Sequence, residues 1–438
     1  MSFKNLRWAV ATASALTLGL AGSALAFHSG GVAECEGCHT MHNSLDGAQM
    51  TTAFAQYQAG PYLLQGSDQS SACLNCHQHA GDTGPSSYHI STAPADMPAG
   101  TAPLQRTPGG DFGWLKKSYS FVVRGSTINN DGEHHGHNIV AADYGYLGAA
   151  GSAPGGTFPA DKLACSSCHD PHGKYRRLSD GSIVDGTATS LPIKNSGSYD
   201  TSADPTTWGA VGVYRLLGGK NYTPKSGTYA FGATTDPPAA VAPGTYNRTE
   251  STTQTRVAYG AGMSEWCANC HGSMLENGYT SGMGGLVHPA GNNAKLGALA
   301  ANYDKYVKSG DLSGTNTSSF SSLVPFEEGS SNYTTLKAHA KNNDTVLAGP
   351  DASSNVNCLS CHRAHASGFA SMLRFPHENE FMTIADATGN SIYPTVAGNA
   401  AVSQGLSDTE QAAALYDRPA TKFAPFQRLL CNKCHAKD

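Results

Sequence analysis

The segment Cys35-Glu-Gly-Cys38-His39-Thr-Met-His42 decides the fold, because Cys-x-x-Cys-His recurs five more times along the chain. This spacing is the attachment motif of c-type haem, in which two thiols bond to the porphyrin and the histidine binds iron. The six copies contain all twelve cysteines. We therefore predict six covalently attached haem c groups, one for each copy. In chain order the copies are motif 1 (Cys35, Cys38, His39), motif 2 (Cys73, Cys76, His77), motif 3 (Cys165, Cys168, His169), motif 4 (Cys267, Cys270, His271), motif 5 (Cys358, Cys361, His362) and motif 6 (Cys431, Cys434, His435).

Other uses of paired cysteines fit this pattern less well. Twelve cysteines in an exported chain can form six disulfides, and Cys-x-x-Cys pairs can bind zinc or exchange thiols. Neither use requires a histidine directly after the second cysteine, yet that histidine stands in all six copies. The repeated histidine favours haem attachment.

The first 26 residues have the features of a secretory signal peptide. Lys4 and Arg7 form a basic start, residues 8–20 are mostly apolar, and Ala24-Leu-Ala26 matches a cleavage site. The apolar run is too short to favour a membrane anchor, and no later stretch reaches membrane-spanning length. We expect residues 27–438 to form a single hexahaem domain with no membrane span. It is expected to be exported through the periplasm to the outer cell surface or beyond.

Charge and composition narrow the class further. The formal charge is −5, and without Lys4 and Arg7 the remaining 26 basic and 33 acidic residues give −7. An acidic chain is a poor partner for nucleic acid. The 50 glycines and 22 prolines predict a fold that is mostly coil, with short helices and little strand. In this fold class, that of a multihaem cytochrome c, the chain wraps around a row of six haems.

Few segments have a clear secondary-structure signal. Residues 292–308 place Leu296, Ala300 and Tyr303 on one face of a predicted helix. The sequence from Ser407 to Glu410 predicts a capping box that opens a helix running to residue 416. Each motif is expected on a short helical turn. Residues 195–255 are expected to contain only short strands, because apolar and polar residues alternate weakly there.

Six of the twelve histidines outside the motifs are predicted to be the second axial ligands. Motifs 1, 3 and 5 carry another histidine three residues on, and a further histidine precedes each of these motifs. The chain thus contains three units of the form His…CxxCHxxH…CxxCH, near residues 27–112, 113–291 and 292–438. The predicted distal ligands are His28, His42, His137, His172, His339 and His365.

Six histidines fall outside this repeat. His79, His89 and His288 remain open as alternative ligands, and His89 is the first of them to consider. His134, His135 and His377 are expected to be solvated or hydrogen-bonded.

The histidine three residues after a motif cannot reach the opposite face of the same ring, so it must serve a different haem. We expect His172 to bind the haem of motif 1 and His365 to bind the haem of motif 3. His42 has no preceding unit, and we expect it to bind the haem of motif 5 in a neighbouring molecule. Such a head-to-tail contact does not close on itself and generates a filament.

Irons with two histidine ligands cannot bind substrate, so the pattern predicts an electron-transfer protein without catalytic residues. The expected partners are other redox cytochromes and extracellular electron acceptors. The alternative is a multihaem periplasmic reductase of a small nitrogen or sulfur oxyanion, which needs one iron with an open face. All six motifs end in histidine, and spare ligands are plentiful, which favours electron transfer.

Residues beyond the motifs resemble a known family. They include Phe27-His28-Ser-Gly-Gly before motif 1, Gln78 and His79 after motif 2, and Gly173-Lys-Tyr after His172. Ser264-Glu-Trp before motif 4 and Ala436-Lys-Asp at the C-terminus belong to the same pattern. The chain thereby resembles the OmcS-type six-haem outer-surface cytochromes, subunits of extracellular nanowires. The resemblance implies stacked bis-histidine haems, polymerisation through the histidine matching His42, and electron delivery to acceptors such as metal oxides or partner cells.

Overall fold

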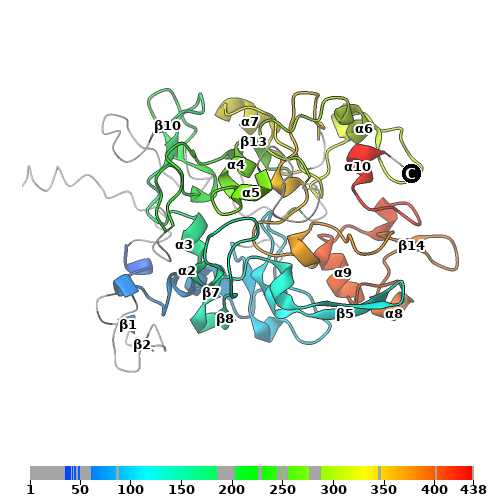
Figure 1. Ribbon diagram of the computed structural model, residues 1–438, viewed down its shortest axis with the longest axis horizontal. Coiled ribbons are helices and arrows are strands. Elements are labelled where there is room, and N and C mark those ends of the chain that lie inside the picture. The colour runs from blue at the N-terminus through cyan, green and yellow to red at the C-terminus, as the bar shows by residue number, and fades with distance from the viewer. Residues whose placement is uncertain are drawn as a thin grey trace, which may run out of the picture.

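The fold is that of a computed structural model, shown in Figure 1. It describes residues 35–40, 42, 44–45, 48–49, 61–84, 88–184, 203–224, 229–243, 250, 255–275, 288–343, 347–399 and 402–436. The predicted signal peptide and His28 lie outside the described residues.

Irregular chain makes up most of the described residues, and the helices are short. The longest helix is α2 with nine residues, in agreement with the predicted coil-rich fold. The helices are α2 (Gln69–His77), α3 (Cys165–Cys168), α4 (Met263–Cys267), α5 (Gly272–Leu275), α6 (Leu299–Lys305), α7 (Tyr333–His339), α8 (Val396–Asn399), α9 (Asp408–Ala414) and α10 (Asn432–His435). Single 3-10 turns include η1 (Cys35–Gly37), η4 (Phe112–Lys116), η5 (Gly132–His135), η8 (Tyr214–Leu216), η11 (Cys358–Ser360) and η12 (Ala370–Met372).

The strands form small sheets of two or three members. The pairs are antiparallel except β3–β4, which is parallel. The strands are β1 (Ser44–Leu45), β2 (Ala48–Gln49), β3 (Gln78–His79), β4 (Ser91–Thr92), β5 (Tyr119–Val123), β6 (Ser126–Asn130), β7 (Val140–Ala141), β8 (Tyr146–Leu147), β9 (Arg176–Arg177), β10 (Ile183–Val184), β11 (Val211–Gly212), β12 (Ala239–Val241), β13 (Ala258–Ala261), β14 (Ile384–Ala385) and β15 (Ser391–Ile392).

The hairpin of β5 and β6 is the most regular sheet, and it was not predicted from the sequence. Its two-residue turn, Arg124 and Gly125, has positive φ angles of 50° and 85°. Positive φ at both central positions matches the right-handed twist of paired strands, so a tight hairpin forms here. The strands expected within residues 195–255 are limited, in the described part, to β11 and β12.

Helix α6 is shorter than predicted at both ends. Instead of spanning residues 292–308 it covers Leu299–Lys305. Upstream, Leu296 N donates to Ser354 O at 2.8 Å, and Gly297 adopts φ +52°, so this stretch pairs with another segment instead of coiling. Leu296, Ala300 and Tyr303 are buried as expected, but Val307 is 50% exposed. Tertiary pairing therefore overrode the helical pattern outside the central turns.

Helix α9 begins as the sequence predicts. Glu410 N donates to Ser407 Oγ at 3.3 Å, and Ser407 N donates to Glu410 Oε2 at 3.0 Å, which completes the capping box. The helix ends at Ala414, two residues before the predicted end, because Tyr416 and Asp417 have φ angles of 57° and 56°. The predicted start is confirmed.

The buried apolar side chains gather around the motifs. The largest cluster includes Trp114, Tyr303 and Met382, and Cys361 and Cys434 pack against it. Smaller clusters include Leu359 of motif 5 and Leu74 of motif 2. In Figure 1, α2 and α3 lie side by side on one flank, and α10 lies against α6 on the other. Within the described ranges, none of the helices is long and apolar enough to cross a membrane.

Candidate haem-binding sites

Each motif winds through one helical turn, as predicted. In motif 1, His39 N donates to Cys35 O at 2.9 Å, and in motif 5, His362 N donates to Cys358 O at 3.0 Å. The same bond closes motifs 3, 4 and 6. Residues three and four apart lie on the same face of a helix. The turn therefore presents both thiols and the imidazole of a motif to one side, as a covalently attached porphyrin requires.

Five of the six motif histidines hydrogen-bond through Nδ1 to a backbone carbonyl. The partners are Tyr62 O for His39, Tyr88 O for His77, Arg215 O for His169, Pro154 O for His271 and Ser371 O for His362, at 2.7 to 3.0 Å. A carbonyl accepts only from a protonated Nδ1, so Nε2 keeps its lone pair. This outer contact is the usual way in which proteins orient a metal-binding histidine.

The motifs follow one another in space in their chain order. Burial and the Cys76 thiol raise the pKa of Cys38, which places motif 1 beside motif 2. A hydrogen bond to Cys165, together with burial, raises the pKa of Cys73 and joins motif 2 to motif 3. Burial and the Cys270 thiol raise the pKa of Cys168, which places motif 3 beside motif 4.

The series continues to the C-terminus. Cys267 hydrogen-bonds Cys358, and this contact and burial raise the pKa of Cys267. Burial and the thiols of Cys431 and Cys434 raise the pKa of Cys361 to about 12. All twelve cysteines are described and none is in a disulfide. The six attachment points therefore form one uninterrupted row from motif 1 to motif 6.

Two predicted distal histidines face the motif histidines that they were expected to serve. The rings of His39 and His172 are stacked, with centroids 6.5 Å apart and an interplanar angle of 8°. The rings of His169 and His365 lie 6.4 Å apart. Two metal–imidazole bonds of about 2 Å each separate such ring centroids by about 6 Å. The ring separations in both pairs match this distance.

Two further pairs have the same separation. His137, a predicted ligand, lies 6.0 Å from His271 of motif 4. Burial lowers the pKa of His137 to about 4, so its imidazole is neutral and able to bind metal at neutral pH. His288 lies 6.2 Å from His435 of motif 6. The repeat pattern favoured His339 over His288, and nothing in the sequence around His288 distinguishes it as a ligand.

His339 lies apart from the motif histidines. Its Nδ1 contacts Glu328 Oε2 at 2.5 Å, and 47% of its side chain is exposed. No ring contact between His339 and a motif histidine occurs within the described ranges. Glu328 also pairs with the buried Arg256, so this carboxylate is already engaged by a guanidinium.

The surroundings of motif 2 contain two candidate ligands. His89 is buried, its Nδ1 lies 2.6 Å from Asp82 Oδ2, and its ring stacks 5.6 Å from that of the exposed His79. Burial is the main cause of the lowered pKa of His77, and the nearby His89 adds to it. A carboxylate behind a histidine is a common support for a metal ligand. The geometry therefore favours His89 over His79.

His42 is exposed near the N-terminal edge of the described chain. Its backbone N–H donates to Thr40 Oγ1 at 3.4 Å. In the part of the chain that the structure describes, His362 of motif 5 makes no ring contact with a second histidine; burial is the main cause that lowers its pKa, and the nearby His271 and His377 add to this shift. An exposed histidine and a motif histidine without a ring contact to a second histidine thus occur among the described residues.

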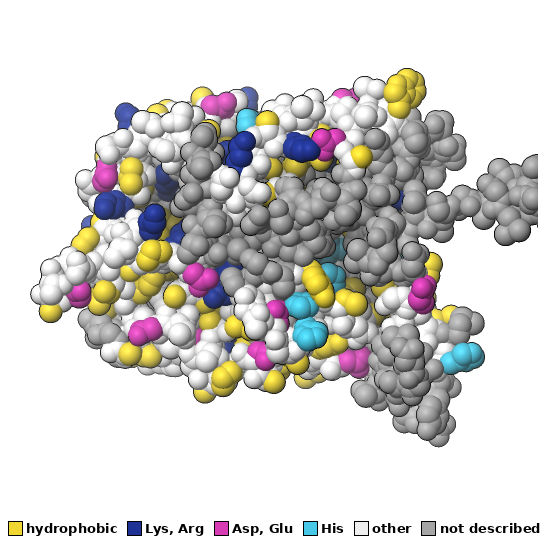
Figure 2. Space-filling model, turned by 180° about the vertical axis from the view of Figure 1, so that it is seen from behind, with side chains coloured by type: hydrophobic (Ala, Val, Ile, Leu, Met, Phe, Trp, Pro, Cys, Tyr) yellow, Lys and Arg dark blue, Asp and Glu magenta, His cyan; other side chains and the backbone are white. Residues whose placement is uncertain are grey.

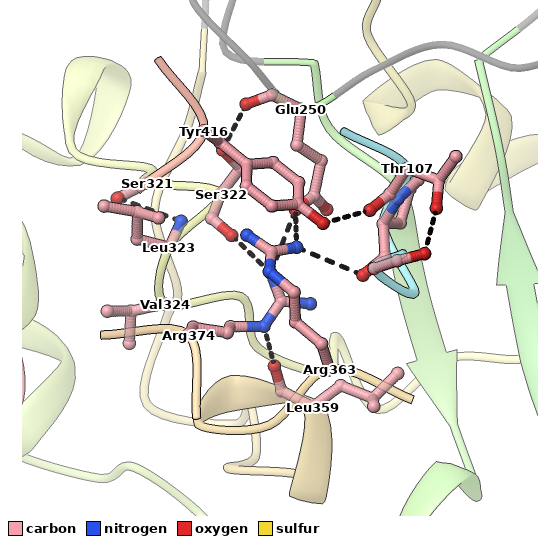
Figure 3. A network of polar contacts seen from close by, with 12 residues as sticks. Thr107, Glu250, Ser321, Ser322, Leu323, Val324, Leu359, Arg363, Arg374 and Tyr416 are labelled. Atoms are coloured by element: carbon pink, nitrogen blue, oxygen red, sulfur yellow. Dashed lines mark hydrogen bonds and ion pairs between the residues drawn. The ribbon is translucent and has the colours of Figure 1, made fainter. Parts of the chain in front are cut away.

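The interior beside motif 5 contains a group that we call the arginine cluster: Arg363, Arg374 and Arg418 with Glu250. Figure 3 shows Arg363, Arg374 and Glu250 from close by. Arg363 Nη1 and Arg374 Nη1 donate to the same oxygen, Glu250 Oε2, at 2.8 and 2.9 Å. Arg418 donates through Nη2 to Ser322 Oγ. Arg363 and Arg374 are 0% exposed and Glu250 is 1% exposed. Burial lowers the pKa of Arg418 to about 10, so all three guanidinium groups are charged at neutral pH.

The arginine cluster has more donors than acceptors. Nε and Nη2 of Arg363, Nη2 of Arg374, and Nε and Nη1 of Arg418 have no hydrogen-bond partner among the described residues. Buried donors in folded proteins are almost always paired. Haem carries two propionates, and guanidinium groups bind carboxylates in a two-pronged geometry. The residues present therefore fit a haem at motif 5, and sequence reasoning missed them because Glu250 and Arg418 lie far from the motif in the chain.

The outer surface shows no large region of one charge on the described part of the face in Figure 2, where acidic and basic side chains are intermixed. Several histidine side chains come to the surface on the same face. A mixed surface gives no basic footprint for nucleic acid.

No protein-family model matches the chain. The chain is 65% identical over 440 residues to the C-type cytochrome OmcS of Geobacter sulfurreducens, and the alignment covers 99% of this chain and 100% of that protein. Two solved structures are similar over 94% of this chain and 100% of their own. One is a cryo-EM structure of OmcS nanowires from Geobacter sulfurreducens, with a TM-score of 0.85 and 67% identity. The other is an Outer Membrane Cytochrome S filament from the same organism, with a TM-score of 0.84 and 66% identity.

Proposed function

The chain belongs to the OmcS family of c-type cytochromes, and on that basis we propose that it is an extracellular electron-transfer protein that assembles into filaments. The observation that carries the proposal is the row of six motifs, four of which face a second histidine at 6.0 to 6.5 Å. A c-type cytochrome holds haem covalently, and haem iron supplies a reversible ferric–ferrous couple. Irons closed on both faces leave no place for substrate, so the reductase alternative is not favoured.

We propose a revised ligand set that departs from the sequence prediction at two positions. His172, His365 and His137 serve motifs 1, 3 and 4, as their ring contacts support. His288 takes the place of His339 and serves motif 6. His89 takes the place of His28 and serves motif 2, supported by its burial and by Asp82 behind it.

The sixth ligand comes from another molecule. His42 is exposed, and once His89 is assigned to motif 2, motif 5 is the motif left without a ring contact to a second histidine among the described residues. His42 of one subunit bound at motif 5 of the next would link the two rows of haem into one. The contact is head-to-tail, so each added subunit leaves a new free end. Repetition gives a filament that conducts electrons to external acceptors or to other redox cytochromes.

Haem stoichiometry provides the first experiment. Intact-protein mass spectrometry and the pyridine haemochrome spectrum of protein purified from the outer surface should both give six haems per chain. The removal of residues 1–26 should be visible in the same mass. Five haems or fewer in correctly processed protein would show that at least one motif carries no haem, contrary to the assignment.

A His42→Ala substitution tests the subunit link. We expect electron microscopy to show single subunits in place of filaments, and the electron paramagnetic resonance spectrum to gain one high-spin iron per chain. His134→Ala is the matched control, since His134 is an exposed histidine outside the ligand set. Filaments of the His42→Ala protein with six low-spin irons would refute the link while leaving haem attachment intact.

A further inference from the structure

The arginine cluster has a surplus of positive charge in the interior. It holds three guanidinium groups, and its carboxylate, Glu250, contributes one negative charge. Arginine stays protonated in proteins, so three positive charges less one negative charge leave a surplus of two. Charges in a low-dielectric interior act more strongly and over longer distances than charges in water.

This surplus lies directly against motif 5. Arg363 follows His362 in the chain, and its guanidinium stacks 3.4 Å above the ring of Tyr416. Arg374 Nε donates to His362 O at 3.0 Å. It also donates to Leu359 O at 2.6 Å, as Figure 3 shows. Leu359 lies between the two cysteines of the motif. The guanidinium of Arg374 is thus held on the same loop that holds the porphyrin and its iron ligand.

Buried charges near the other motifs are closer to balance among the described residues. Arg256 pairs with Glu328. Arg106 lies beside the arginine cluster, where its backbone O accepts from Glu250 N, and it pairs with Asp417 at 3.0 Å, so the surplus of the cluster is unchanged. In motif 6, Lys433 contributes one buried positive charge, and its Nζ donates to Tyr306 O. Motif 3 is followed by the buried Arg176 and Arg177, with the buried Asp170 beside them. Among fully buried side chains the largest surplus on a single motif is therefore that of motif 5, whereas the additional arginine beside His169 of motif 3, Arg215, is only half-buried.

One acidic residue near motif 5 needs to be weighed against this surplus. Glu327 is buried near Cys358, and burial is the main cause that raises its pKa to about 8. A carboxyl group with this pKa is mostly protonated at neutral pH. It therefore does not cancel the charge of the arginine cluster.

We propose that the arginine cluster makes the haem attached at motif 5 the highest-potential centre of the six. Fixed positive charge disfavours the ferric iron, which carries one more positive charge than the ferrous iron, and so favours reduction. Propionates bound to the guanidinium groups lower the surplus, but the loss of any one arginine still removes one positive charge. The loss of an arginine therefore lowers the reduction potential whether or not propionates are bound to the cluster. The inference rests on the proposed function because it needs a haem at motif 5.

Under this proposal each subunit is reduced first at the motif that receives His42 from its neighbour. The electron that enters a subunit would rest longest at the junction between subunits. Arg363, Arg374 and Arg418 would then be positioning residues for electron transfer, since they act on iron through charge without binding it.

Redox titration of the intact six-haem protein tests the proposal. Arg418→Gln removes one positive charge whose guanidinium donates to the Ser322 hydroxyl, and Arg374→Gln removes one that also supports the motif loop. In both variants we expect the highest of six fitted couples to shift at least tenfold toward the ferric state, which is 59 mV for one electron. Arg374→Lys keeps the charge and should keep that couple within threefold of the parent.

Arg124→Gln is the control for charge removal alone, because Arg124 is exposed at the turn of the β5–β6 hairpin. It should leave all six couples unchanged. The proposal is overturned if Arg418→Gln, with six haems attached, titrates like the parent protein. It is equally overturned if the couple that shifts is not the highest one. A haem count below six in the parent protein is a different result, which refutes the proposed function itself.

Discussion

The substitution Glu250→Gln puts the arginine cluster to its most direct stability test. Glu250 Oε2 accepts from Arg363 at 2.8 Å and from Arg374 at 2.9 Å, and all three side chains are at most 2% exposed. Glutamine has a similar shape but no charge, so two buried guanidinium groups lose their shared counter-charge. Removal of one partner from a buried pair costs about 3–5 kcal/mol.

The matched variant is Arg418→Gln. It removes a positive charge from a cluster that has too many, together with two nitrogens that have no partner among the described residues. We expect a cost of about 1 kcal/mol or less, because removing an unpaired buried donor recovers part of its desolvation penalty. Both substitutions replace a buried charged side chain with glutamine, but they remove charges of opposite sign. The difference between their free energies of unfolding therefore reports the charge balance of the cluster.

The assay is guanidinium chloride unfolding of the haem-loaded protein, followed by tryptophan fluorescence and by the haem Soret band. The midpoint should fall sharply for Glu250→Gln and little for Arg418→Gln. The double variant Glu250→Gln with Arg363→Gln should be more stable than Glu250→Gln alone, since it removes one of the uncompensated charges. Equal costs for the two single variants, within about 0.5 kcal/mol, would refute the reasoning.

Three further predictions concern a ligand, a buried carboxyl and a helix cap. His288→Ala should convert one iron to high spin in the electron paramagnetic resonance spectrum, whereas His339→Ala should leave all irons low-spin, and the reverse result would restore the sequence-based assignment. The pKa of Glu327, raised by burial to about 8 from 4.5, means that the folded state binds this proton more tightly than the unfolded state. Stability should therefore fall as pH rises from about 4.5 to about 8, and Glu327→Gln should flatten this slope in thermal melts; an unchanged slope would contradict the assignment. Ser407→Ala should cost about 1 kcal/mol in denaturant unfolding because it removes the cap that bonds Glu410 N, and a cost near zero would mean that water replaces the cap.

The sequence by itself determined the cofactor chemistry. Six Cys-x-x-Cys-His motifs define haem attachment through covalent spacing alone, and covalent spacing does not depend on how the rest of the chain packs. The start of α9 could also be predicted from the local sequence, because a capping box needs only Ser407 and Glu410 three residues apart. The pairings of His172 and His365 were also expected from the sequence, since a histidine just after a motif must serve another ring, and the structure supports them by ring contacts.

Only the tertiary structure decided which of the remaining histidines approach the motifs. His288 lies close to His435, although the repeat pattern favours His339. The repeat gives only the order of histidines along the chain, whereas the folded row of motifs determines which of them lie close to a motif. The predicted helix over residues 292–308 lost its first turns to pairing with residues 352–356 for the same reason. The arginine cluster joins Glu250 to arginines more than a hundred residues away, and burial, which gives those charges their strength, is a property of the folded interior alone.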